Sequence, residues 1–155
     1  MLRSNDVKIF ALCAAFAAAV SPGISRAALG ELEVSVQNDA TQLHASIKSS
    51  EDRTLYRVHE IQLPSGTLLR EFVAADGKVF AVAWNGPFMP NLRQALGKYF
   101  DAYAAAPRSE ISDRKHRQVN QPGLVVQASG HTRAFAGRAY LPTALPQGMN
   151  LGDLQ

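Results

Sequence analysis

The sequence predicts an α+β fold in which a small antiparallel sheet, a three-stranded meander plus a C-terminal hairpin, packs against one main helix. Between Thr54 and Tyr103, three runs rich in β-branched and aromatic residues are separated by glycine turns and followed by a helical pattern. Between Leu124 and Tyr140, two further strand-like runs flank another glycine turn. The first block predicts the meander and its helix, and the second predicts the hairpin.

The meander is expected to consist of strands over Leu55–Leu63, Thr67–Val73 and Lys78–Trp84. Pro64-Ser65-Gly66 and Ala75-Asp76-Gly77 separate these runs, and both are typical turn sequences. After its lysine, the third run is apolar on both faces, which is typical of a strand in the centre of a covered sheet. We therefore expect the residues from Val79 to Trp84 to be buried.

The main helix is expected to begin after Asn91, whose side-chain oxygen is suited to accept from free N–H groups of the first turn. Apolar residues then recur at helical spacing and predict one face that packs on the sheet. Gly97 falls in the middle of this pattern, and we interpret it as a point of close approach between helix and sheet. The apolar stripe contains Leu92, Leu96, Tyr99 and Tyr103, widened by Ala95 and Phe100.

Residues 1–27 have the layout of a secretory signal peptide. A basic start at Arg3 and Lys8 precedes the short apolar run Ile9–Val20, which is shorter than the roughly 20 residues that span a bilayer. Helix-breaking residues follow, and Ser25-Arg26-Ala27 places small residues where a signal peptidase reads. We expect cleavage after Ala27, a periplasmic or secreted location, and no transmembrane anchor in the mature chain.

Removal of this leader changes the charge and the cysteine content of the chain. The leader contains three of the 16 basic residues and one of the 13 acidic residues, so the mature chain is nearly neutral. This balance argues against binding to nucleic acid or to an anionic membrane. Cys13 is the only cysteine, lies within the apolar run and is not at the cleavage point of a lipoprotein. We expect residues 28–155 to form a single α+β domain without disulfides and with a proline-rich C-terminal tail.

The remaining segments carry weaker patterns. We expect a short helix over Val36 to Ala45, and a polar entry to the first strand over Lys48–Asp52. Arg108–Gln121 is polar and charged, which is typical of a solvated loop rather than of a phosphate site. The tail contains too many prolines for a regular element, and we expect Leu151 and Leu154 to attach it to the domain.

The histidines do not form a recognisable catalytic or metal-binding pattern. His44, His59, His116 and His131 lack the spacing of metal ligands, and no cysteine can complete a zinc set. The sequence also lacks a nucleophile elbow, a phosphate loop and a dinucleotide fingerprint. We expect no metal and no cofactor, and His131, in a glycine turn, is a weak candidate for a general base.

A binding site is predicted where the central strand leads into the helix. Trp84 ends the strand, and the loop Gly86–Pro90 presents Phe88 and Met89 between two prolines. A stiff loop loses little entropy on binding, and aromatic and methionine side chains are enriched at interfaces. The alternative is that Phe88 and Met89 fold inward and close the end of the core.

Two functions follow from these observations. The first is a non-enzymatic, exported envelope protein that binds another protein or a cell-envelope ligand through a sheet edge or the Phe88 loop. The second is a small periplasmic hydrolase or lyase that uses His131 together with Arg133, Arg138 or a carboxylate that the sequence does not place. The position of His131 discriminates between them, because a base requires a pocket and a neighbouring acid.

Four segments resemble those of a known protein family. They are Val58–Thr67, Gly77–Pro87, Leu92–Phe100 and Gly130–Pro142. Together they are similar to an uncharacterised family of exported Gram-negative bacterial proteins, the domain of unknown function 2844. The resemblance covers nearly all of the mature chain and implies export and a single small domain. It implies no activity, ligand or catalytic residue.

Overall fold

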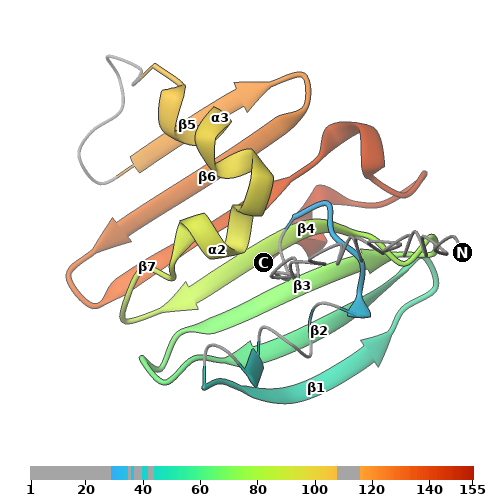
Figure 1. Ribbon diagram of the computed structural model, residues 1–155, viewed down its shortest axis with the longest axis horizontal. Helices are drawn as coiled ribbons and strands as arrows, with labels where there is room; N and C mark the ends of the chain where they lie inside the picture. Colours follow the sequence, from blue (N-terminus) through green and yellow to red (C-terminus); the bar gives the residue numbers. More distant parts are fainter. Residues whose placement is uncertain (1–28, 35, 37–39, 42–43, 108–115) are drawn as a thin grey trace, which may run out of the picture.

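One antiparallel sheet dominates the computed structural model, which describes residues 29–34, 36, 40–41, 44–107 and 116–155 (Figure 1). Within these residues the sheet has seven strands in the order β1-β2-β3-β4-β7-β6-β5. In chain order the strands are β1 (Ser46–Asp52), β2 (Tyr56–Gln62), β3 (Leu68–Ala74), β4 (Val79–Gly86), β5 (His116–Gln121), β6 (Leu124–His131) and β7 (Ala134–Tyr140).

The expected α+β class, with a three-stranded meander and a separate C-terminal hairpin, is therefore wrong. The hairpin β6–β7 joins the meander because β7 pairs with β4, and the sheet gains the edge strands β1 and β5. The sequence predicted a polar entry at Lys48–Asp52 and a polar loop that included β5. All seven residues of β1 are exposed, and Val119 is the only buried residue of β5. Such strands lack the apolar alternation by which a half-buried strand is recognised.

The meander itself is confirmed. Strands β2, β3 and β4 pair in sequence, and the residues from Val79 to Trp84 are all buried, as expected of a central strand. The turn before β4 contains Gly77 at a φ of 79°, which is a conformation that glycine adopts without steric cost. A β-bulge between Phe72 and Val73 shifts the register of β3 against β4.

The expected helix is present but interrupted. It consists of α2 (Leu92–Leu96), the 3₁₀ turn η1 (Gly97–Tyr99) and α3 (Phe100–Ala105). Asn91 caps α2 as predicted, because its side chain accepts from two backbone N–H groups of the first turn. Gly97 ends α2 with a φ of 51°. This positive φ is one that glycine adopts without the steric cost of a Cβ atom.

The helical segment covers one face of the sheet, which we call the helix face (Figure 1). Leu96 is fully buried there, and Leu92 and Tyr99 pack beside it as predicted. The sheet contributes inward-facing side chains from β2, β3, β4, β6 and β7, including Ile61, Val82 and Val126. Leu29, which precedes the first strand, is buried in the same core.

The opposite face, which we call the tail face, has a second apolar core. Phe72, Phe80 and Tyr140 form this core together with smaller residues of β4 and β6. The C-terminal segment 142–155 covers it and includes the 3₁₀ turns η2 (Pro142–Ala144) and η3 (Leu151–Asp153). Leu154 is 1% exposed and Leu151 is 37% exposed. Of the two expected attachment points, only Leu154 enters the core.

Two sequence predictions concern other parts of the chain. Half of the helix expected over Val36 to Ala45 lies outside the described residues, and within the described half Val36, Ala40 and Thr41 are helical. No helix in the described part of the chain is both long and apolar enough to cross a membrane.

Candidate binding site

A row of polar side chains crosses the tail face from one edge of the sheet to the other. The pairing register places one residue from each strand in this row, and alternation along the strands turns their side chains to the same face. Ala83 is the one apolar member and separates two arginines. In strand order the row, which we call the polar row, contains Ser49, Glu60, Arg70, Ala83, Arg138, Gln127 and Gln118.

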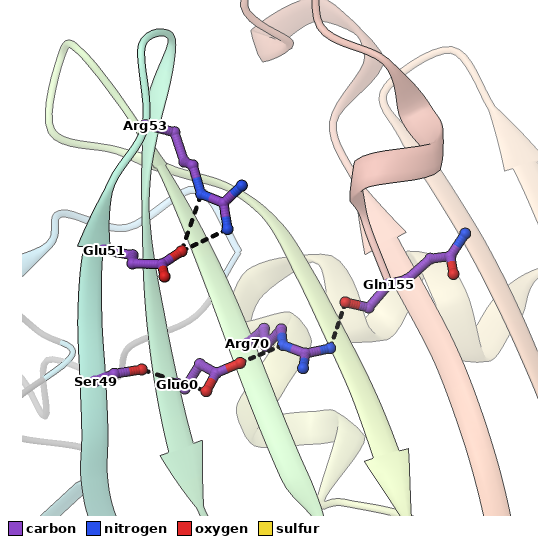
Figure 2. Close-up of polar contacts among 6 residues, drawn as sticks. All are labelled: Ser49, Glu51, Arg53, Glu60, Arg70 and Gln155. Carbon is purple, nitrogen blue, oxygen red and sulfur yellow. Dashed lines mark hydrogen bonds and ion pairs between the residues drawn. The ribbon is translucent and has the colours of Figure 1, made fainter.

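Arg70 is the centre of one half of the polar row (Figure 2). Its Nε donates to Glu60 Oε1 at 2.6 Å, and its Nη1 donates to the main-chain oxygen of Gln155 at 2.5 Å. Ser49 Oγ donates to the other oxygen of Glu60 at 3.3 Å. The Arg70 hydrogen bond holds the pKa of Glu60 below its usual value, and burial opposes this shift only in part. Glu60 is therefore an ionised, immobilised acceptor near neutral pH.

Arg138 organises the other half of the polar row with neutral partners. Its Nε donates to the Gln127 side-chain oxygen at 2.8 Å, and its Nη1 donates to the main-chain oxygen of Leu151 at 2.5 Å. Arg70 and Arg138 thus hold main-chain oxygens at the two ends of the last five residues. Together with the buried Leu154 side chain, they fix the C-terminal segment across the middle of the tail face.

A hollow of about 370 Å³, which we call the first hollow, lies on the β1–β3 side of this segment. Its rim is highly charged, and Arg53 donates from both Nε and Nη2 to Glu51 Oε2 (Figure 2). Asp153 and Tyr56 also line this hollow, and burial raises the pKa of the Tyr56 hydroxyl. The first hollow therefore offers hydrogen-bonding groups of both charges around an aromatic side chain.

A larger hollow of about 600 Å³, the second hollow, lies on the other side of the C-terminal segment. Arg70 and Gln155 line both hollows and form the wall between them. Arg138 and Asn85 supply the remaining polar side chains of the second hollow. Its apolar surface includes Leu68, Ala136 and Leu154.

The structure does not bring the sequence-predicted binding residues Trp84, Phe88 and Met89 together. Trp84 is 2% exposed and belongs to the helix-face core, where its indole lies against Gly137, and it also lines the second hollow. Phe88 and Met89 are 54% and 40% exposed. The buried Thr67 fixes their loop, because its Oγ1 donates to the Phe88 oxygen at 2.7 Å and accepts from the Phe88 N–H at 3.2 Å. These two bonds attach the loop to Thr67, and both side chains are exposed to solvent.

His131, the candidate base, is exposed at the end of β6. Its ring lies edge-on to that of His116, with 6.4 Å between ring centroids, and no described carboxylate forms an ion pair with it. Arg133 is exposed in the adjoining turn, and Arg138 is bonded within the polar row. Among the residues that the structure describes, no three histidine, cysteine or acidic side chains group as metal ligands.

Sequence reasoning missed the polar row, although a signal for it exists. In β3, Arg70 alternates with Leu68 and Phe72, and in β7, Arg138 alternates with Ala136 and Tyr140. Each arginine therefore occupies a position on an otherwise apolar strand face. A charged residue at such a position needs a specific partner, and this requirement marks it as a candidate site residue.

The comparisons with known proteins define a family but add no activity. No curated protein and no solved structure matches the chain. One family model, described as "Protein of unknown function (DUF2844)", matches residues 25–154. This match covers the meander, the helical segment, the hairpin and nearly all of the tail, and it agrees with the resemblance found in the sequence. The chain therefore belongs to the DUF2844 family of proteins of unknown function.

Proposed function

We propose that this protein is an exported, non-enzymatic protein of the cell envelope that binds a ligand on the tail face of its sheet. The export part of the proposal is supported by the leader pattern of residues 1–27, with its basic start, short apolar run and small residues before Ala28.

The proposal that the protein binds a ligand is supported by the pair of hollows on either side of the C-terminal segment. Concave surfaces that combine apolar floor with a few fixed polar groups are typical of ligand sites. Arg70, shared by both hollows, is fixed by Glu60 and by Gln155. Groups that are already oriented lose little entropy when a ligand binds.

The same contacts favour binding over catalysis. A general acid or base needs a pKa near the working pH. In the first hollow, the pKa of Glu60 is lowered by Arg70, and the nearby Glu51 is bonded to Arg53. A carboxylate with a lowered pKa, such as Glu60, serves as a hydrogen-bond acceptor rather than as a proton donor. The exposed His131 has no described acid as partner, so a hydrolase or lyase based on it has less support.

Binding and catalysis are separated by recovering the ligand. The mature protein is immobilised and incubated with the small-molecule fraction of a native envelope extract, and retained compounds are identified by mass spectrometry. We expect a retained compound of the same mass as in the untreated extract. A product that accumulates with wild type, but not with the exposed-site variant His131→Ala, would contradict the proposal and support the enzyme.

Export is tested separately on protein from its native host. We expect the periplasmic or secreted fraction to contain a chain whose intact mass begins at Ala28. A chain that retains Cys13 would contradict both the cleavage and the expectation that the mature chain has no membrane anchor.

A further inference from the structure

The second hollow is lined by two cationic side chains and by no acidic one. Arg70 and Arg138 face it together with the Asn85 amide, and its remaining side chains are mainly apolar. Glu60, which partners Arg70, lines the first hollow instead. The side chains of the lining thus carry positive charge, of which the Gln155 main-chain oxygen bound by Arg70 offsets a part.

Arg138 should attract an anion more strongly than an ordinary surface arginine does. Its two bonded partners are the neutral amide oxygen of Gln127 and the neutral main-chain oxygen of Leu151. No carboxylate among the described residues forms an ion pair with it. A guanidinium group has five N–H donors, so Arg138 retains donors for a further acceptor. A partly buried cation with neutral partners gains more from an anionic ligand than a paired one does.

The two arginines come from strands on either side of β4 and both line the second hollow. Arg70 and Arg138 both pair with Ala83, on either side of β4, so their backbones are two strand spacings or about 10 Å apart. Ala83 itself is buried with Leu154 in the tail-face core, and the second hollow opens beside it at Asn85. The long arginine side chains can therefore approach one oxyanion from two sides. Beyond them, Leu68 and Leu154 offer apolar surface to the rest of a ligand.

We propose that the second hollow binds an amphipathic anion, whose carboxylate or phosphate lies between Arg70 and Arg138 and whose apolar body contacts Leu68 and Leu154. This inference rests on the proposed binding function and names its ligand class. The hollow, at about 600 Å³, has the size of a small-molecule site. Arginine suits such a head group because its planar N–H donors match two oxygens at once.

The proposal is tested with four six-carbon probes that share one apolar body: hexanoate, hexyl phosphate, hexanol and hexylamine. Binding is followed by amide chemical shifts of the mature chain, with any tag at its N-terminal end so that Gln155 is unaltered. We expect at least one of the two anions to shift the amides of Asn85 and Arg138, with weaker or no binding of hexanol and hexylamine. The relative affinities of the two anions identify the preferred head group. Equal affinities for hexanol and for both anions would overturn the proposal.

A charge-removing variant and a matched control test the role of the arginine. Arg138→Gln keeps a polar side chain, and Arg93→Gln removes the same charge from the exposed surface of α2. We expect Arg138→Gln to weaken anion binding by about tenfold, because a charge-assisted hydrogen bond becomes a neutral one. Arg93→Gln should bind as wild type does. Unchanged anion affinity in a folded Arg138→Gln protein would refute the assignment.

A second measurement on wild type keeps the proposal testable if Arg138→Gln fails to fold. Added salt should weaken anion binding, because screening reduces the attraction of partly exposed charges. A salt-independent affinity would contradict the proposal. If no anion binds but an envelope compound is retained unchanged, the ligand class is wrong while the proposed binding function stands.

Discussion

The attachment of the C-terminal segment to the tail face depends on one side chain, and Leu154→Ala measures its contribution. Leu154 is 1% exposed and lies in the core formed with Phe72 and Phe80. The substitution removes three carbon groups, which at about 0.8 kcal/mol each corresponds to about 2.4 kcal/mol of transfer free energy. The cavity contribution should be small, because the site borders the second hollow and water can enter. We expect a loss of about 2–3 kcal/mol in the free energy of unfolding.

Urea denaturation measures this loss, and Leu151→Ala is the matched control. Leu151 is in the same segment and has the same side chain, but it is 37% exposed. Its substitution should change the free energy of unfolding by less than about 0.5 kcal/mol, the usual range for surface positions. Equal losses in the two variants would refute the view that Leu154 anchors the tail. Hydrogen exchange at β3 and β7 would then show whether the tail is attached at all.

Three further predictions concern the helix face, the N-terminal segment and the Phe88 loop. Leu96→Ala should cost about 2–5 kcal/mol, as large-to-small core changes do, and an unchanged denaturant midpoint would show that the helix is not docked. Hydrogen bonding by Arg57 lowers the pKa of Glu33 below 4.5. The ionised Glu33 carboxylate therefore stabilises the folded protein above that pH, and this stabilisation is lost as the pH falls through the lowered pKa. Glu33→Gln should therefore be less stable than wild type at pH 7, and thermal melts should show the difference shrinking on acidification. The double variant Phe88→Ser, Met89→Ser should melt close to wild type because both side chains are exposed, and a clearly lowered melting temperature would instead support the alternative that they close the end of the core.

The sequence predicted the interior of the fold better than its edges. The central run Val79–Trp84 and the Asn91 cap are confirmed because burial and capping leave local signals in the residue types. Strands β1 and β5 gave no such signal, since their stability comes from hydrogen bonds to a neighbouring strand. The pairing of β4 with β7 joins segments about 55 residues apart, and no local pattern specifies it.

The candidate site was less predictable than the fold. The polar row depends on the register of seven strands, and each member alone is an ordinary polar residue. Arg70 and Arg138 become a pair only after β4 is placed between β3 and β7. The sequence drew attention to Trp84 and Phe88 because aromatic residues stand out, yet one is buried and the other lies on an exposed loop.

The position of the retained envelope ligand on the protein tests most directly whether the tail face of the sheet is the binding surface. Amide chemical shifts of the mature protein can be recorded with and without that ligand, and mapped on the sheet. We expect the largest changes at Arg70, Asn85 and Arg138, with little change along α2 and α3. Changes concentrated instead at the exposed edge of β1, or at Phe88 and Met89, would contradict a binding site on the tail face.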